Sequence, residues 1–236
     1  MRYFIGNWKM FGVPKSVNIL NKINSFYSKD KNRNKYRVVI TPPYTLIESY
    51  SRYFKNKKIS IGAQNCYQKE QFSSNTAAIS PYMLKGVGAK YTLIGHSDNR
   101  GEGDTDAMLK DKVKYAINNN LKVVFCIGEN KKEKKNKKTL SVLKSQLVQV
   151  LEKKFNKNNI IIAYERIWSI GTGKILNEKD LLRTITYIKK VLKDIFKKNS
   201  PAVLYGGSVD ENNVDMLRQI KEIDGFLIGG ASKSSK

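Results

Sequence analysis

The sequence predicts an α/β protein folded as one closed (β/α)8 barrel. Eight short apolar runs recur along the 236 residues, and stretches with helical spacing of apolar residues separate them. Most of these runs are apolar throughout, which is typical of strands covered on both faces in a parallel sheet. Strands joined by crossovers of roughly 30 residues are βαβ units, and about eight such units fill a barrel of roughly 250 residues.

The expected strands are five to seven residues long. They cover residues 3–8, 37–41, 59–64, 91–95, 122–128, 160–165, 202–206 and 225–229.

The expected helices lie between these strands. Residues 14–27 start with proline, which suits the first turn of a helix, and continue with apolar residues at helical spacing. The same spacing predicts helices over residues 106–120, 139–155 and 178–196, and shorter ones at 44–54, 65–78 and 81–87. The lysine-rich run at 130–138 is read as a solvated loop or a helix start.

The chain is expected to form a single domain over residues 1–236. No stretch rich in Pro, Gly and Ser divides it, and the rhythm of strand and helix never restarts. Periodicity alone leaves one alternative, an open doubly wound parallel sheet.

The composition narrows the class of protein. No run of about 18 apolar residues is present, so no membrane span is expected, and the first ten residues do not resemble a signal peptide. Two cysteines and one histidine are too few for a disulfide framework or a zinc site built from them. These features predict a cytoplasmic protein without a metal.

The charge is strongly basic, with 44 Lys and Arg against 20 Asp and Glu and a net charge of +24. A basic chain can bind nucleic acid or steer an anionic substrate. Here Lys and Asn are abundant along the whole chain, whereas a nucleic-acid interface gathers its charge on one element. Compositional drift is therefore preferred, and no nucleic-acid partner is expected.

Polar residues and glycines follow several predicted strands, where a barrel places its chemistry. Asn7 and Lys9 follow the first strand, His96 the fourth, and Glu165 ends the sixth. Each has a plainer reading when taken alone: a carboxylate can cap a helix, a histidine can be structural, and Lys9 can extend from the edge of the core. Glycines follow the seventh and eighth strands and could be simple turn residues, and "GTGK" (171–174) is only a fragment of a phosphate loop.

Together, seven strings make the chain resemble triosephosphate isomerase over essentially its whole length. They are "GNWKM" (6–10), "GAQN" (62–65), "IGHS" (94–97), "CIGE" (126–129), "AYE" with "IGTGK" (163–174), "YGGSV" (205–209) and "GFLIGGAS" (225–232). The resemblance implies a TIM barrel and a cofactor-free, cytoplasmic homodimer of glycolysis and gluconeogenesis. It also implies a substrate pair, dihydroxyacetone phosphate and glyceraldehyde 3-phosphate.

The resemblance also assigns roles to residues. Glu165 would be the base that moves a proton between adjacent carbons, and His96, with Lys9 and Asn7, would stabilise the enediolate oxygen. The use of a neutral imidazole as electrophile is a known property of that family, so the resemblance implies this role for His96. Gly171, Ser208, Gly229 and Gly230 match the family's phosphate contacts, with Lys9 adding positive charge. The loop after Glu165 would close over the phosphate and exclude water.

Two groups of residues depart from the family pattern. Arg166 stands where the family usually has proline, so we expect a looser hinge and a charge that favours ionised Glu165. Asp98 and Asn99 replace a usual Glu and Arg, and Ala78 replaces the Glu that pairs with that Arg. An ion pair that supports the dimer is thus missing, although Thr76 is retained and a dimer is still expected.

The last departure is at the C-terminus, where the family continues into a closing helix after "GGAS". We expect this helix to be shortened or missing and apolar surface beside the first and last strands to be exposed. Three rival functions remain: a degenerate, non-catalytic barrel that acts as a binding protein, another phosphate-binding barrel enzyme, and a basic nucleic-acid-binding protein.

Overall fold

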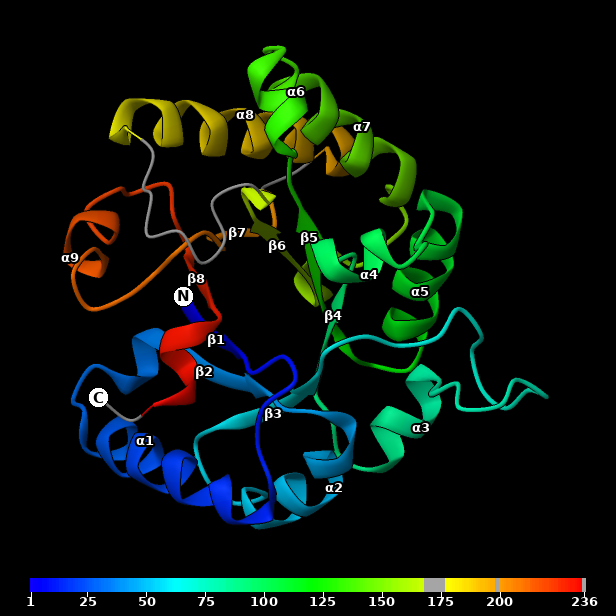
Figure 1. Ribbon diagram of the computed structural model, residues 1–236, viewed down its shortest axis with the longest axis vertical. Helices are drawn as coiled ribbons and strands as arrows, with labels where there is room; N and C mark the ends of the chain where they lie inside the picture. The colour runs from blue at the N-terminus through cyan, green and yellow to red at the C-terminus, as the bar shows by residue number, and fades with distance from the viewer. Residues whose placement is uncertain (168–176, 198–199, 235–236) are drawn as a thin grey trace.

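Eight parallel strands close into a barrel in which each strand pairs with its sequence neighbours and β1 pairs with β8 (Figure 1). The structure is a computed structural model that describes residues 1–167, 177–197 and 200–234. The strands are β1 (Arg2–Asn7), β2 (Tyr36–Thr41), β3 (Ser60–Ala63), β4 (Tyr91–Ile94), β5 (Lys122–Ile127), β6 (Ile160–Tyr164), β7 (Ala202–Tyr205) and β8 (Gly225–Ile228). All eight predicted strands are confirmed, and the open doubly wound sheet is wrong because the two edge strands pair.

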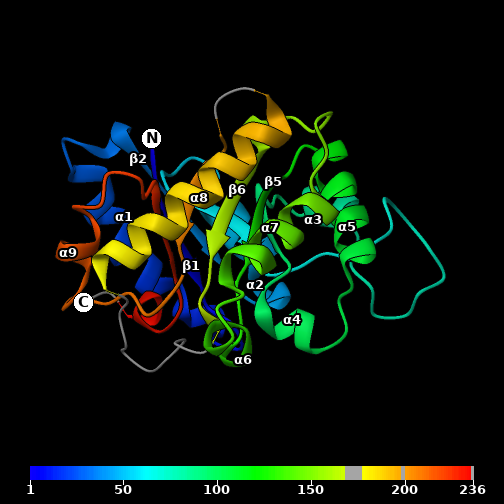
Figure 2. The same cartoon turned by 90° about the horizontal axis from the view of Figure 1, so that it is seen from above.

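Helices surround the barrel and cover the outer faces of its strands (Figures 1 and 2). They are α1 (Val17–Lys29), α2 (Tyr44–Tyr53), α3 (Pro81–Gly86), α4 (Ser97–Gly101), α5 (Asp106–Asn118), α6 (Lys131–Lys135), α7 (Thr139–Val150), α8 (Glu178–Phe196) and α9 (Val214–Leu217). Short 3-10 turns are η1 (Pro14–Ser16), η2 (Arg33–Lys35), η3 (Lys157–Asn159) and η5 (Gly230–Lys233). The lysine-rich run does start a helix, because Asn130 caps α6 and its amide oxygen accepts the N–H of Glu133.

The helix expected at 65–78 is wrong, because this segment is an irregular loop between β3 and α3. The loop projects from the body of the molecule in both views (Figures 1 and 2). Cys66 is its one fully buried residue, so the segment lacks the apolar face that stabilises a helix through packing. Ala77 also adopts a left-handed backbone with φ of 63°, which interrupts a helix.

Alternate residues of each strand point into the barrel and out of it. On β6, Ile161 and Ala163 pack in the interior cluster, whereas Ile162 and Tyr164 pack in the outer layer between strands and helices. Continued for one residue, this alternation directs Glu165 toward the mouth of the barrel. Strand pairing therefore determines which side chains can reach the site.

An apolar groove of about 520 Å³ lies on the outside of the barrel between α1 and α9. Phe4, Ile23, Val38 and Ile228 contribute to its walls, and Phe26 beside it is 77% exposed. After β8 the described chain forms the turn η5 and no helix. Residues of β1, β2 and β8 line this groove.

A buried ion pair between α5 and the residues just before it also contacts the start of the projecting loop. The ammonium of Lys112 on α5 lies 2.7 and 2.8 Å from the carboxylate oxygens of Asp104, and it donates to the Asn65 side chain at 3.2 Å. The side chains of Lys112 and Asp104 are only 4% and 9% exposed. Removal of one partner would leave a charge buried without compensation.

We predict that Lys112→Met lowers the free energy of unfolding by about 3–5 kcal/mol, because Asp104 would lose its counter-charge. Lys110→Met on the same helix is the matched control, since Lys110 pairs with Glu152 at the surface and such pairs contribute about 0–1 kcal/mol. Urea unfolding measures both variants. Equal losses of stability in the two variants would contradict the prediction.

Candidate active site

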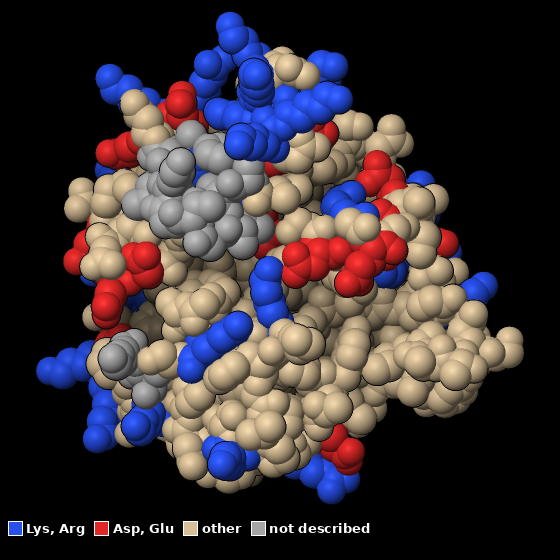
Figure 3. Space-filling model, viewed as in Figure 1, with Lys and Arg blue, Asp and Glu red and all other residues tan. Residues whose placement is uncertain are grey.

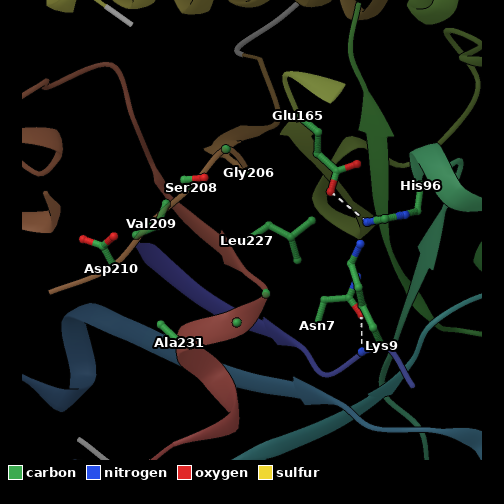
Figure 4. A pocket seen from close by; sticks show the side chains of 13 residues that line it. Asn7, Lys9, His96, Glu165, Gly206, Ser208, Val209, Asp210, Leu227 and Ala231 are labelled. Carbon is green, nitrogen blue, oxygen red and sulfur yellow. Dashed lines mark hydrogen bonds and ion pairs between the residues drawn. The ribbon is translucent and has the colours of Figure 1, made fainter. Parts of the chain in front are cut away.

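A pocket of about 220 Å³ opens at the carboxyl ends of the strands (Figure 4). Asn7, Lys9, His96 and Glu165 form one side, and the turn after β7 and the start of η5 form the other, with Leu227 between them. The remaining lining residues are Gly206, Gly207, Ser208, Val209, Asp210, Gly229, Gly230 and Ala231. Residues far apart in the chain thus meet because their strands end at the same rim.

Glu165 is held by the backbone of β5 and β6. Its N–H donates to the carbonyl of Ile127 at 2.8 Å, and a Cβ on Gly128 would collide with the Glu165 carbonyl. The carboxylate points into the pocket, where Oε1 lies 3.2 Å from Nε2 of His96. Both residues are 4% exposed, so the contact is shielded from bulk water.

The contacts of His96 indicate which of its nitrogens carries a proton. His96 precedes the short helix α4, and its Nδ1 accepts the backbone N–H of Asp98 at 3.1 Å. An accepting Nδ1 has no proton, so the proton of the neutral ring is on Nε2, which faces Glu165. A carboxylate oxygen of Asp98 also lies 3.4 Å from Nδ1, but the backbone N–H is closer.

Two opposing effects act on the pKa of His96. Burial lowers it, but the charge of the Glu165 carboxylate and its hydrogen bond raise it more strongly. Lys9 lowers the pKa and Asp98 raises it, and the net direction is upward. The upward shift depends on a contact that any ligand inserted between the two side chains would break. A bound ligand would therefore favour the neutral imidazole.

Lys9 reaches the pocket through an unusual backbone conformation. Its φ is 53°, in the left-handed region, where side chains other than glycine are uncommon. The amide oxygen of Asn7 accepts the Lys9 N–H at 3.0 Å, and Gln64 donates to the Lys9 carbonyl at 2.8 Å. The ammonium lies 3.1 Å from Asp98. Two side chains thus hold the strained turn that aims Lys9 toward His96 (Figure 4).

The glycine-rich side of the pocket presents main chain to its occupant. A Cβ on Gly229 or Gly230 would meet no atom within 4 Å, so a ligand can approach both backbones closely. The indole N–H of Trp8 donates to the carbonyl of Ser232 in η5 at 2.9 Å. This bond fixes η5 next to the turn that carries Lys9.

The structure brings seven of the eight predicted site residues together, namely Asn7, Lys9, His96, Glu165, Ser208, Gly229 and Gly230. Gly171 lies outside the described residues. Gln64 and Leu227 received no role from the sequence, although both stand within quoted strings. Their interactions could have been found only by knowing that strands 1, 2, 3 and 8 converge, because neither residue type is itself distinctive.

The residues that depart from the family pattern differ in their position relative to the pocket. Arg166 does not line the pocket, and its guanidinium lies against Tyr205, so its expected effect on the ionisation of Glu165 stays a prediction. Asp98, although one methylene shorter than the usual Glu, reaches Lys9 directly. Ala78 and Asn99 have no charges, so the ion pair expected in the family cannot form here.

Charge on the face that carries the pocket is uneven (Figure 3). Lysines gather over α6, and acidic side chains lie over α4. Within the described residues, no group of three or more His, Cys, Asp and Glu side chains is placed to hold a metal ion. No described helix has the length and apolar character needed to cross a bilayer.

Comparison with known proteins agrees with this geometry. The family model described as Triosephosphate isomerase matches residues 2–236. The chain belongs to the triosephosphate isomerase family. It is 33% identical to the triosephosphate isomerase of Thermodesulfovibrio yellowstonii, over 98% of this chain and 94% of that protein. It is 36% identical to that of Yarrowia lipolytica, over 98% and 93%.

A solved structure shows the same fold. The crystal structure of triosephosphate isomerase from Bartonella henselae superposes with a TM-score of 0.90 at 32% identity, covering 99% of this chain and 94% of that one. The activity is therefore that of triosephosphate isomerase, the aldose–ketose isomerase of glycolysis.

We predict that Glu165→Gln lowers the pKa of His96, because the carboxylate supplies the strongest upward effect and burial then dominates. His96 is the single histidine of the chain, so its imidazole signals can be titrated by NMR without assignment by mutation. Asp98→Asn is the comparison variant and should lower the pKa less. An unchanged pKa in Glu165→Gln would contradict this account of the site.

Proposed function

We propose that Glu165, His96, Lys9 and Asn7 carry out the interconversion of dihydroxyacetone phosphate and D-glyceraldehyde 3-phosphate. One observation supports this most directly: the Glu165 carboxylate and the proton-bearing Nε2 of His96 are 3.2 Å apart in a shielded pocket. A substrate carbon and its adjacent oxygen would insert between them. The base then contacts carbon while the imidazole contacts oxygen.

The proton transfer needs only one carboxylate. Glu165 would take a proton from one carbon, leaving an enediolate, and return it to the neighbouring carbon. The Nε2–H of His96 and the ammonium of Lys9 would stabilise the negative oxygen, in positions fixed before the substrate arrives. Asn7 would act by holding the Lys9 backbone and by lining the pocket beside the substrate.

The phosphate would bind at the opposite side of the pocket. Ser208, Gly229 and Gly230 are proposed contacts, and their main chain borders the pocket in a part with room for close approach. Gly171 is a further proposed contact from the family resemblance. Lys9 also lines this pocket, and its positive charge would offset part of the phosphate charge.

We also propose a homodimer formed through the projecting loop. Phe72 in this loop is 75% exposed and packs against Tyr82, which is itself 45% exposed. Met10 is 99% exposed. The exposed aromatic pair of Phe72 on the projecting loop and Tyr82 on α3 favours contact with another protein surface.

Further proposals concern organisation and location. The chain is proposed to be one domain, since the barrel uses strands from residue 2 to residue 228. A cytoplasmic location is supported by two unpaired, buried cysteines. Reaction without a cofactor and the lack of a nucleic-acid partner also stay predictions. No observation favours the non-catalytic binding protein.

We predict that Glu165→Asp lowers kcat by about tenfold or more, on the order of 1.4 kcal/mol, because the shorter side chain withdraws the base. A coupled assay of triose phosphate isomerisation measures the change. Glu48→Asp on α2 is the matched control, because this exposed side chain pairs with Arg52 at the surface and the change should leave kcat unchanged. Similar rates in the wild type and Glu165→Asp would exclude Glu165 as the base.

For the assembly, we predict a species of twice the 26.9 kDa chain mass in light scattering at micromolar concentration. Phe72→Asp should shift it toward the single chain by placing a charge in the interface. A wild type that stays at 26.9 kDa would refute the dimer.

A further inference from the structure

Arg166 follows the catalytic base and is completely buried, with a relative exposure of 0%. Burial of a guanidinium is costly unless it is paired and hydrogen-bonded. The groups around Arg166 must therefore compensate its buried positive charge. One of these groups is the hydroxyl of Tyr205.

The Arg166 guanidinium is directed at Tyr205 on β7. Nη2 donates to the Tyr205 hydroxyl at 2.9 Å, and Cζ lies 5.9 Å from the centre of its ring. Tyr205 is paired in register with Tyr164 on β6, and both side chains belong to the outer layer. Glu165 contacts His96 in the pocket, so neighbouring residues 165 and 166 act on opposite sides of the chain.

A buried polar network surrounds this contact. The Tyr164 hydroxyl donates to a carboxylate oxygen of Glu129 at 3.1 Å, and Glu129 is 0% exposed. Burial, then the charge of Glu129, raises the pKa of Tyr164, and the charge of Arg166 opposes this effect. The guanidinium is thus close enough to act on both tyrosines.

The Tyr205 hydroxyl contacts the backbone of the loop that follows β7. A Cβ on Gly207 would collide with the Tyr205 hydroxyl, so the hydroxyl lies directly against the Gly207 backbone. The Gly206 N–H donates to the Tyr164 carbonyl at 2.8 Å, and a Cβ on Gly206 would be 2.9 Å from Cγ of Glu165. Only two contacts separate Arg166 from the backbone of the pocket wall.

We propose that Arg166 is a positioning residue that holds Tyr205 and, through its hydroxyl, the turn 206–210 on the phosphate side of the pocket. This inference rests on the proposed function, in which Ser208 of that turn binds the substrate phosphate. The turn lines the pocket and has no regular secondary structure, so its backbone needs external support. A charge-assisted hydrogen bond fixes the hydroxyl more firmly than packing of the ring alone.

The effect should appear in phosphate binding more than in proton transfer. Loss of the guanidinium leaves Glu165 held by Ile127 and His96, whereas Tyr205 loses its donor. We expect Arg166→Met to raise KM for both triose phosphates and the inhibition constant of inorganic phosphate by about tenfold. kcat should change by less than about threefold, because the reacting groups stay in place.

The test uses four variants of the full chain. Tyr205→Phe removes only the hydroxyl and should reproduce the rise in KM and in the phosphate constant. The double variant should be no worse than Arg166→Met, because both changes remove the same support. Arg183→Met, on the exposed face of α8, is the matched control and should leave every constant unchanged. Thermal unfolding of each variant reports whether it is folded.

Several results would overturn the proposal. They are an unchanged phosphate constant in Tyr205→Phe, additive effects in the double variant, or a fall in kcat with KM unchanged. If Arg166→Met does not fold, Tyr205→Phe alone decides. Calorimetry also measures the binding of inorganic phosphate to each variant, and this measurement needs no turnover. An inactive wild type would therefore refute the proposed function, whereas phosphate binding by the variants would still test the role of Arg166.

Discussion

Closure of the barrel by the pairing of β1 with β8 is the constraint on which the site depends. Tyr3, Phe4, Ile5 and Gly6 pair with the four residues of β8, and a Cβ on Gly225 would collide with the Tyr3 backbone, so glycine permits this close pairing. This pairing brings the turn that carries Lys9 beside η5. The bond from Trp8 to Ser232 then fixes the two halves of the pocket relative to one another.

The same geometry divides the side chains at the rim into those that line the pocket and those that pack behind it. Side chains that point inward at the rim, such as Glu165 and His96, form the reacting side of the pocket. Side chains that point outward, such as Tyr164, Tyr205 and Arg166, form a buried polar layer behind it. Strand alternation thus allows adjacent residues to have different surroundings, because one faces the pocket and the next faces the supporting layer.

The His96 environment shows how contacts assign a role to a side chain. A backbone N–H at Nδ1 fixes the ring as a donor through Nε2, which suits stabilisation of a developing negative oxygen. The neighbouring carboxylate raises the pKa in the free protein, and the substrate would remove that contact. Under the proposed mechanism, a substrate inserted between the carboxylate and the imidazole would remove this upward shift of the His96 pKa and favour the neutral ring.

The sequence by itself predicted the order of strands, most helices and three side chains, Lys9, His96 and Glu165, that the structure brings to one pocket, because apolar periodicity and short strings are local properties. It failed at residues 65–78, where local composition permits a helix but no buried face exists to stabilise one. The tertiary structure alone decided that Gln64 supports Lys9, that Arg166 reaches Tyr205 and that Trp8 anchors η5. These contacts join residues on different strands, and their partners are set by barrel closure and register, which no local pattern encodes.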